Sequence, residues 1–130
     1  MTVALVLVSH SPQVAEGTAD IVRQMAGEIE VLPVGGDSEG GFGTDPEKIQ
    51  TAMESAGAEE VLVFMDLGSA VLSAETVLDM LSAEDKERVW LVDAPFVEGA
   101  FSAGVAASAG DDAEACIESA MEAQTESKLH

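Results

Sequence analysis

Basic residues are scarce in this sequence. Its 130 residues include 5 lysines and arginines against 25 aspartates and glutamates, a formal net charge of −20. Binding to duplex nucleic acid or to an anionic membrane surface needs cations, so both partners are excluded. The acids are spread along the chain rather than gathered in one tail, which is typical of a solvated surface. The excess of acidic over basic residues predicts a halophilic protein. Such a protein works in concentrated salt, which screens the repulsion among its carboxylates.

Cysteine and long apolar runs are also scarce. Cys116 is the only cysteine, so the sequence can form neither an internal disulfide nor a cysteine metal cluster. No apolar run approaches the roughly 18 residues that cross a bilayer, and the N-terminus lacks the basic segment of a signal peptide. The hydrophobic fraction of 47% is nevertheless ample for a core. We therefore expect a single domain over residues 1–130, frayed from about residue 124, in a reduced, cytoplasmic setting.

Short apolar runs alternate with helical patterns along the chain. The runs at 3–8, 29–34, 60–65 and 88–92 are expected to be strands. Amphipathic spacing predicts helices at 12–25, 44–56, 70–81 and 96–107, and a last helix from 111. This alternation predicts an α/β fold: an open parallel sheet of about four strands in the order 2-1-3-4, with helices on both faces.

Two details of the helices follow from residue spacing. The first helix is expected to bury a face made of Val14, Thr18, Ile21, Val22 and Met25. Thr44 and Glu47 have capping-box spacing, and Pro46 lies between them. We therefore expect Thr44 to be the N-cap of the second helix.

Residues that could take part in catalysis or binding follow each strand. They are His10 and Ser11 after the first strand, a glycine-rich loop at 35–43 with Thr44 after the second, Asp66, Gly68 and Ser69 after the third, and Asp93 after the fourth. Parallel strands bring these loops to one edge, where α/β sheets bind ligands. Each residue alone has an ordinary explanation: His10 as a loop residue, Thr44 and Ser69 as N-caps.

Together, these residues predict a phosphoryl group carried on imidazole. A carboxylate can orient the ring, and hydroxyls and helix N-termini favour the added negative charge. No lysine or arginine lies in these loops, which disfavours a kinase or ATPase that clamps nucleotide phosphates with cations.

Four motifs resemble a known family. They are Val8-Ser-His10-Ser, the Gly35-Gly36 and Gly43-Thr44 loop, Asp66-Leu-Gly-Ser69-Ala, and Asp93-Ala-Pro-Phe-Val-Glu-Gly-Ala100-Phe. In order and spacing they resemble the phosphotransferase subunit M of phosphoenolpyruvate-dependent dihydroxyacetone kinase. That subunit is related to the mannose-type enzyme IIA of the sugar phosphotransferase system. The resemblance extends from Val3 to about Ala123.

The resemblance implies roles for individual residues. His10 would be the phosphorylated nucleophile and Asp66 would orient its ring. The phosphoryl-binding groups would be Ser11, Gly43, Thr44, Gly68 and Ser69. Asp45 stands where the family often has serine, a departure that affects the contacts of the glycine-rich loop.

The resemblance also implies partners. The subunit would accept the phosphoryl group from a separate histidine phosphocarrier and pass it to ADP bound on the L subunit of dihydroxyacetone kinase. ATP regenerated there phosphorylates dihydroxyacetone on the K subunit. The chain itself would bind no cofactor and no metal, and its relatives are homodimers.

Other interpretations stay open. A mannose-type enzyme IIA of a sugar transporter would share this fold and chemistry but would pass the group to a transporter domain. A small metallochelatase-like protein would bind a metal through His10 and would need further His or Glu ligands. Phosphatase or mutase chemistry would need an Arg-His-Gly signature, whereas Ser9 precedes His10. A plain anion-binding module would bind phosphate without covalent labelling.

The net charge makes a prediction about stability. Repulsion among carboxylates is less screened as the Debye length grows from about 3 Å at 1 M salt to about 10 Å at 0.1 M. We therefore expect the melting temperature, followed by circular dichroism, to rise as KCl is raised across this range. A melting temperature that does not respond to KCl would contradict the adaptation to high salt.

Overall fold

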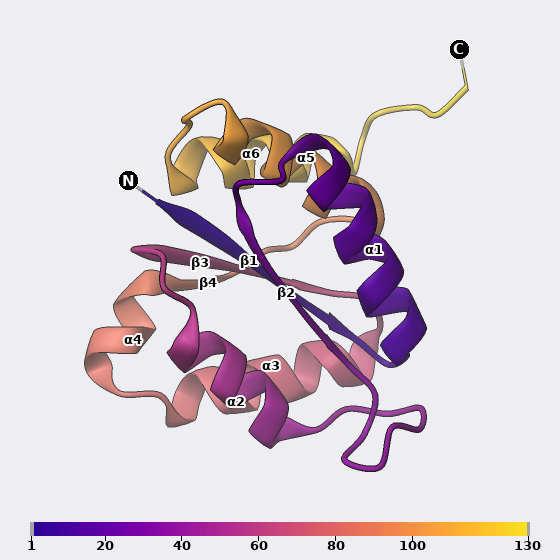
Figure 1. The fold of residues 1–130 in the computed structure, drawn as a ribbon, viewed down its shortest axis with the longest axis vertical. Coiled ribbons are helices and arrows are strands. Elements are labelled where there is room, and N and C mark those ends of the chain that lie inside the picture. Colours follow the sequence, from indigo (N-terminus) through magenta and orange to yellow (C-terminus); the bar gives the residue numbers. More distant parts are fainter. Residues whose placement is uncertain (1, 130) are drawn as a thin grey trace.

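A parallel four-stranded sheet forms the centre of the molecule (Figure 1). The computed structural model describes residues 2–129; His130, for which the sequence suggests no role, lies outside them. The strands are β1 (Val3–Ser9), β2 (Glu30–Gly35), β3 (Glu60–Met65) and β4 (Val89–Leu91). The helices are α1 (Pro12–Met25), α2 (Pro46–Ser55), α3 (Gly68–Met80), α4 (Ala83–Arg88), α5 (Phe96–Ser108) and α6 (Ala113–Glu122). The strand order β2-β1-β3-β4 confirms the predicted α/β architecture.

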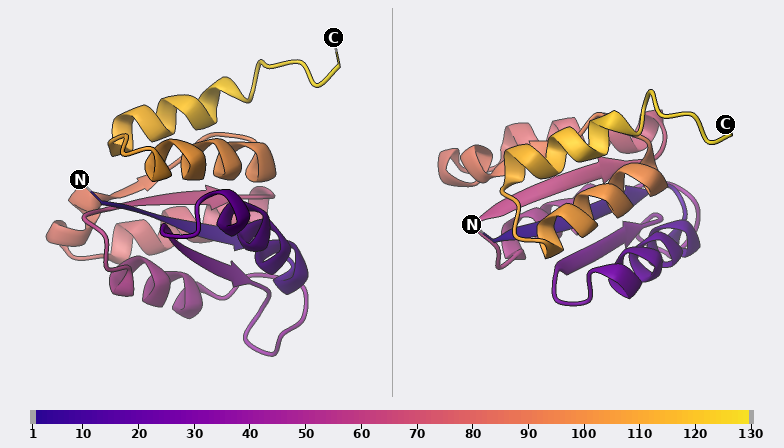
Figure 2. Two further views of the ribbon diagram at one scale, coloured as in Figure 1. Left: turned by 45° about the horizontal axis from the view of Figure 1, so that its top comes forward. Right: turned by 90° about the horizontal axis from the view of Figure 1, so that it is seen from above.

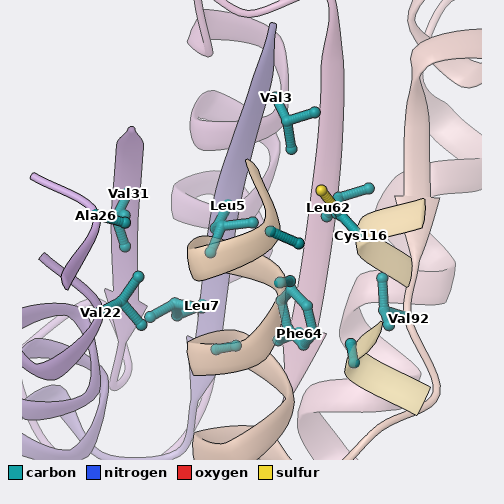
Figure 3. Packing of buried hydrophobic residues seen from close by; sticks show 14 of the residues in the cluster. Val3, Leu5, Leu7, Val22, Ala26, Val31, Leu62, Phe64, Val92 and Cys116 are labelled. Carbon is teal, nitrogen blue, oxygen red and sulfur yellow. The ribbon is translucent and has the colours of Figure 1, made fainter. Parts of the chain in front are cut away.

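β1 is a central strand that is buried on both faces. Its seven residues are all buried, and alternate side chains point to opposite layers of helices. Leu5 and Leu7 pack with α1, α5 and α6, whereas Val6 and Val8 pack with α2 and α3. Figure 2 shows these helices on both sides of the sheet, and Figure 3 shows Leu5 and Leu7 in the first of the two cores. Burial on both faces explains why this strand is a continuous apolar run in the sequence.

The buried face of α1 differs from the expectation. Its buried residues are Ala15, Thr18, Ala19 and Val22. Three of the residues expected to be buried are instead exposed: Val14 (44%), Ile21 (45%) and Met25 (62%). The reason is the close approach of α5, where Gly104 lies against Val22. Small side chains fit at such a contact, so the alanine stripe faces inward and the larger side chains lie outside it.

Two features near the helix boundaries were also missed. The N-cap of α2 is Asp45, whose carboxylate accepts the N–H of Glu47, so the expectation for Thr44 is wrong. Aspartate is at least as good an N-cap as threonine, and here it directly precedes a proline at the first helical position. The short helix α4 was not predicted, because it buries no residue and therefore has no apolar periodicity.

Cys116 is part of the first core (Figure 3). Burial raises the pKa of its thiol to about 11, with Asp111 and Asp112 adding to the shift. The thiolate is the reactive form of cysteine, so this thiol is inert at neutral pH. The residue is thus structural, and the chemistry of the chain lies elsewhere.

Gly104 determines how closely α5 and α1 can pack. A Cβ at Gly104 would lie 2.6 Å from Val22 Cγ1. We expect Gly104→Ala to lower the free energy of unfolding by about 1–3 kcal/mol, the usual cost of overpacking, as measured by urea denaturation.

Gly17→Ala in α1 is the matched control, because no atom lies within 4 Å of a Cβ at that position. Alanine should there stabilise the helix by about 0.5–1 kcal/mol. If both variants changed stability by the same amount, Gly104 would not be the point of close packing.

Candidate functional site

The carboxyl end of β1 holds the residues around which the candidate site is built. Ser9 is the last residue of the strand, and the half-buried His10 follows it. Ser11 is the N-cap of α1, and its Oγ accepts the N–H of Val14 at 3.3 Å. The connection between strand and helix is therefore only two residues long, which restricts where the His10 side chain can lie.

Asp66, directly after β3, binds three groups around His10. Its carboxylate accepts hydrogen bonds from the Ser9 hydroxyl at 2.7 Å and from the Leu67 N–H at 2.7 Å. Its two oxygens lie 3.3 and 3.2 Å from the backbone nitrogen of His10. The sequence led us to expect Asp66 on the imidazole ring, whereas these bonds reach the backbone of His10. Asp66 thus fixes the point from which the imidazole side chain projects.

The group that reaches the imidazole ring is the hydroxyl of Ser69. Its Oγ lies 2.8 Å from Nδ1 of His10 and 3.2 Å from Nε2. Ser69 is in the first turn of α3, and no side chain caps the N-terminus of this helix. First-turn N–H groups have no partner within a helix, and the helix dipole adds partial positive charge there. The imidazole therefore lies where an anion is favoured.

The glycine-rich loop between β2 and α2 is attached to the same edge. The Gly36 N–H donates to the carbonyl of Ser9 at 3.1 Å, and the Gly43 N–H donates to the carbonyl of His10 at 2.9 Å. Both glycines have positive φ, +80° and +135°, which side chains rarely permit. These contacts bring the loop against His10, as the sequence predicted.

The interior of this loop is itself hydrogen-bonded. Asp37 Oδ1 accepts the N–H of Gly41 at 2.8 Å and that of Glu39 at 2.9 Å. These two bonds, that from Gly41 first, lower the pKa of the Asp37 carboxyl. The Lys48 ammonium donates to the backbone carbonyl of Asp37 at 2.7 Å. The loop therefore has a defined conformation despite its glycine content.

Two expected residues have other partners in the structure. The Thr44 hydroxyl lies 2.8 Å from that of Ser73, one helical turn beyond Ser69. Asp93 contributes its backbone carbonyl to the side-chain amide of Gln124. The structure thus brings together His10, Asp66, Ser69 and Gly43, and it places the hydroxyl of Thr44 on α3 instead of on the imidazole.

Ser9 and Ser73 are contacts of the site that the sequence analysis did not single out. Ser9 is fully buried, and besides donating to Asp66 its oxygen accepts the N–H of Ser11 at 3.0 Å. A serine at the end of an otherwise apolar buried strand is the signal for such a role. Ser73 follows Ser69 at i+4, which places both on one side of a helix.

Among residues 2–129, no group of three or more His, Cys, Asp or Glu side chains is placed to hold a metal ion. The metallochelatase-like interpretation, which needs such ligands beside His10, therefore finds no support in this part of the chain. None of the described helices is long and apolar enough to cross a membrane.

Comparison with known proteins shows the family to which this chain belongs. The family of the PTS system fructose IIA component matches residues 4–117, so the chain belongs to this family. Its relatives include phosphoryl donor subunits of dihydroxyacetone kinases, all called DhaM. The chain is 36% identical over 118 residues to the DhaM of PEP-dependent dihydroxyacetone kinase 2 of Listeria innocua, covering 89% of this chain and 94% of that protein.

Longer relatives also match. The chain is 44% identical over 126 residues to DhaM of Escherichia coli K12, covering 93% of this chain and 27% of that protein, so it spans about a quarter of the longer relative. A crystal structure of a protein of unknown function superposes over the whole of both chains, with a TM-score of 0.90 and 39% identity. The recognised resemblance to the M subunit is thereby confirmed.

Proposed function

We propose that this chain is a phosphohistidine carrier, with His10 as the residue that is phosphorylated. It accepts the phosphoryl group from a histidine phosphocarrier and passes it to ADP bound on the L subunit of a dihydroxyacetone kinase. The proposal is supported by the relatives, which are phosphoryl donor subunits of such kinases. The observation that carries it is the Ser69 hydroxyl 2.8 Å from the His10 ring, at a helix N-terminus that no side chain caps.

The transfer exchanges one P–N bond for another. An unprotonated ring nitrogen of His10 attacks phosphorus, and the bond to the carrier's imidazole breaks as that imidazole leaves with the electron pair. The Ser69 hydroxyl can accept the N–H of the other ring nitrogen or donate to a phosphoryl oxygen. In the second transfer a terminal phosphate oxygen of ADP attacks the phosphorus, and His10 is released as free imidazole.

The α3 N-terminus is the main source of stabilisation for the phosphoryl charge. The N–H groups of Gly68 and Ser69 are in its first turn and can donate to phosphoryl oxygens. Ser11, Gly43 and Thr44 would have to exchange existing partners to take part, since the first caps α1, the second binds the His10 carbonyl and the third binds Ser73.

The absence of a cationic clamp suits a carrier. The glycine-rich loop and the β3–α3 connection contain no lysine or arginine, so the phosphoryl group would be held by dipoles and could leave readily. Nucleotide is therefore assigned to the partner subunit, and this chain is proposed to bind no cofactor of its own.

A second candidate function is the mannose-type enzyme IIA of a sugar transporter. Membership of the PTS fructose IIA family favours it, because the same phosphohistidine would serve a transporter domain. The two functions differ in the acceptor. The phosphorylated chain should lose its label to ADP when the L subunit is added, and should keep it when a transporter domain is added; the opposite result would assign the chain to sugar transport.

His10 should be the sole site of phosphorylation. Incubation with phosphoenolpyruvate, enzyme I and the histidine phosphocarrier should give one acid-labile phosphoryl group per chain, located by mass spectrometry. His10→Ala should remove it completely. An adduct that persists in His10→Ala, with circular dichroism showing an intact fold, would assign the chemistry to another residue.

A further inference from the structure

We propose that Thr44 and Ser73 are positioning residues for the phosphoryl transfer. Their hydroxyl oxygens lie 2.8 Å apart, and this bond ties the end of the glycine-rich loop to α3. Thr44 thereby acts on His10 through the loop, rather than by binding the phosphoryl group itself. The inference rests on the proposed function, because it concerns the reaction proposed for His10.

Ser73 is an unusual residue for the interior of α3. Serine is a poorer helix former than alanine, and a hydroxyl within a helix commonly binds the carbonyl four residues earlier. Thr76 does so, since its Oγ1 donates to the carbonyl of Leu72 at 2.9 Å. The Ser73 hydroxyl is instead paired with that of Thr44, 29 residues earlier in the chain. A contact outside the helix therefore accounts for serine at this position.

Thr44 is not needed as a helix cap. The carboxylate of Asp45 caps α2, which leaves the neighbouring Thr44 hydroxyl for another partner. Thr44 directly follows Gly43, which has a φ of +135° and no side chain that could hold it in place. The Thr44 hydroxyl thus supplies a side-chain contact that ties this end of the loop to a helix.

The hydroxyl pair closes a ring of contacts around His10. On the loop side, the Gly43 N–H donates to the His10 carbonyl at 2.9 Å, and Thr44 follows Gly43. On the helix side, the Ser69 Oγ lies 2.8 Å from Nδ1 of the His10 ring. Ser73 is four residues after Ser69, on the same side of α3 and about 6 Å along its axis. Loss of the pair would release the loop side and leave the helix side in place.

The packing of α2 beside α3 does not depend on this pair. Both helices cover the same face of the sheet and contribute to the second of the two cores (Figure 1). Their buried residues there are Ile49, Ala52 and Met53 of α2 and Ala70, Ala74 and Val77 of α3. Apolar burial is the dominant favourable contribution to such packing. Removal of the half-buried hydroxyl pair should therefore loosen the loop without unfolding the protein.

The test compares Thr44→Val, Ser73→Ala and the double variant, with pre-phosphorylated, purified histidine phosphocarrier as the donor. Thr44→Val keeps the shape of the side chain and removes its hydroxyl. Each single variant should lower the rate of His10 phosphorylation at saturating phosphocarrier by about two- to tenfold, the range expected for one hydrogen bond, at unchanged KM and melting temperature. Because both residues act through the same bond, the double variant should be no slower than either single variant.

Hydrogen exchange of the Gly43 N–H is a second readout, which needs no phosphoryl transfer. This N–H binds the His10 carbonyl, so a loosened loop should exchange it faster. NMR on the unphosphorylated chain should show exchange about two- to tenfold faster in both single variants. Thr44→Ser, which keeps a hydroxyl, should retain the parent exchange and the parent rate of phosphorylation.

Thr76→Ala is the matched control, because it removes a hydroxyl from the same helix that binds only within that helix. It should keep the parent rate and the parent exchange of Gly43. Losses that add up in the double variant would mean that Thr44 contacts the phosphoryl group itself, and would overturn the inference. A parent rate in either single variant, or a change confined to the KM or to the melting temperature, would also overturn it.

The two proposals fail in different ways. If the hydroxyl pair has no positioning role, the parent chain is still phosphorylated on His10 and the variants behave like the parent. If the proposed function is wrong, the parent chain acquires no phosphoryl group even at saturating phosphocarrier, whatever the exchange of Gly43 shows.

Discussion

The site depends on one carboxylate that joins the ends of two strands. Asp66 follows β3, yet its oxygens accept from the Ser9 hydroxyl and the His10 N–H at the end of β1, and from the N–H of Leu67 at the start of the next helix. Charge-assisted bonds of this kind are stronger than neutral ones. A single group therefore fixes where His10 leaves the sheet and where α3 begins, and so places Ser69 on the imidazole.

Around His10, the dipoles of a hydroxyl and of the α3 N-terminus take the place of lysine or arginine side chains. The chain has only 5 basic residues, and three of them donate to backbone carbonyls: Arg23 to that of Val31, Lys48 to that of Asp37, and Arg88 to carbonyls at and just beyond the end of α2. What remains at His10 is a hydroxyl and an uncapped helix N-terminus, which favour an anion without a full countercharge. This makes the proposed chemistry compatible with the concentrated salt that the net charge of −20 suggests.

Sequence reasoning succeeded where one physical signal was dominant. The alternation of apolar runs with helical patterns predicted the parallel sheet and its strand order, and the places of His10 and the glycine-rich loop after their strands predicted the sheet edge at which these residues meet. It failed where tertiary packing determined which side chains are buried and which groups meet. The buried face of α1 follows from the contact at Gly104, and the hydrogen-bond partner of Asp66 follows from the strand register. Hydrogen bonds across 57 residues, such as Ser9 to Asp66, have no local sequence signature.

The central claim is that Asp66 acts by holding the backbone of His10. Asp66→Asn keeps the shape of the side chain but replaces one accepting oxygen with an NH₂ group, which faces other donors. The account predicts that the rate of His10 phosphorylation at saturating phosphocarrier falls about 100-fold, the cost of a misplacement of about 1 Å. Asp79→Asn, at the far end of α3, should keep the parent rate. An Asp66→Asn protein that is folded and phosphorylated at the parent rate would contradict the account.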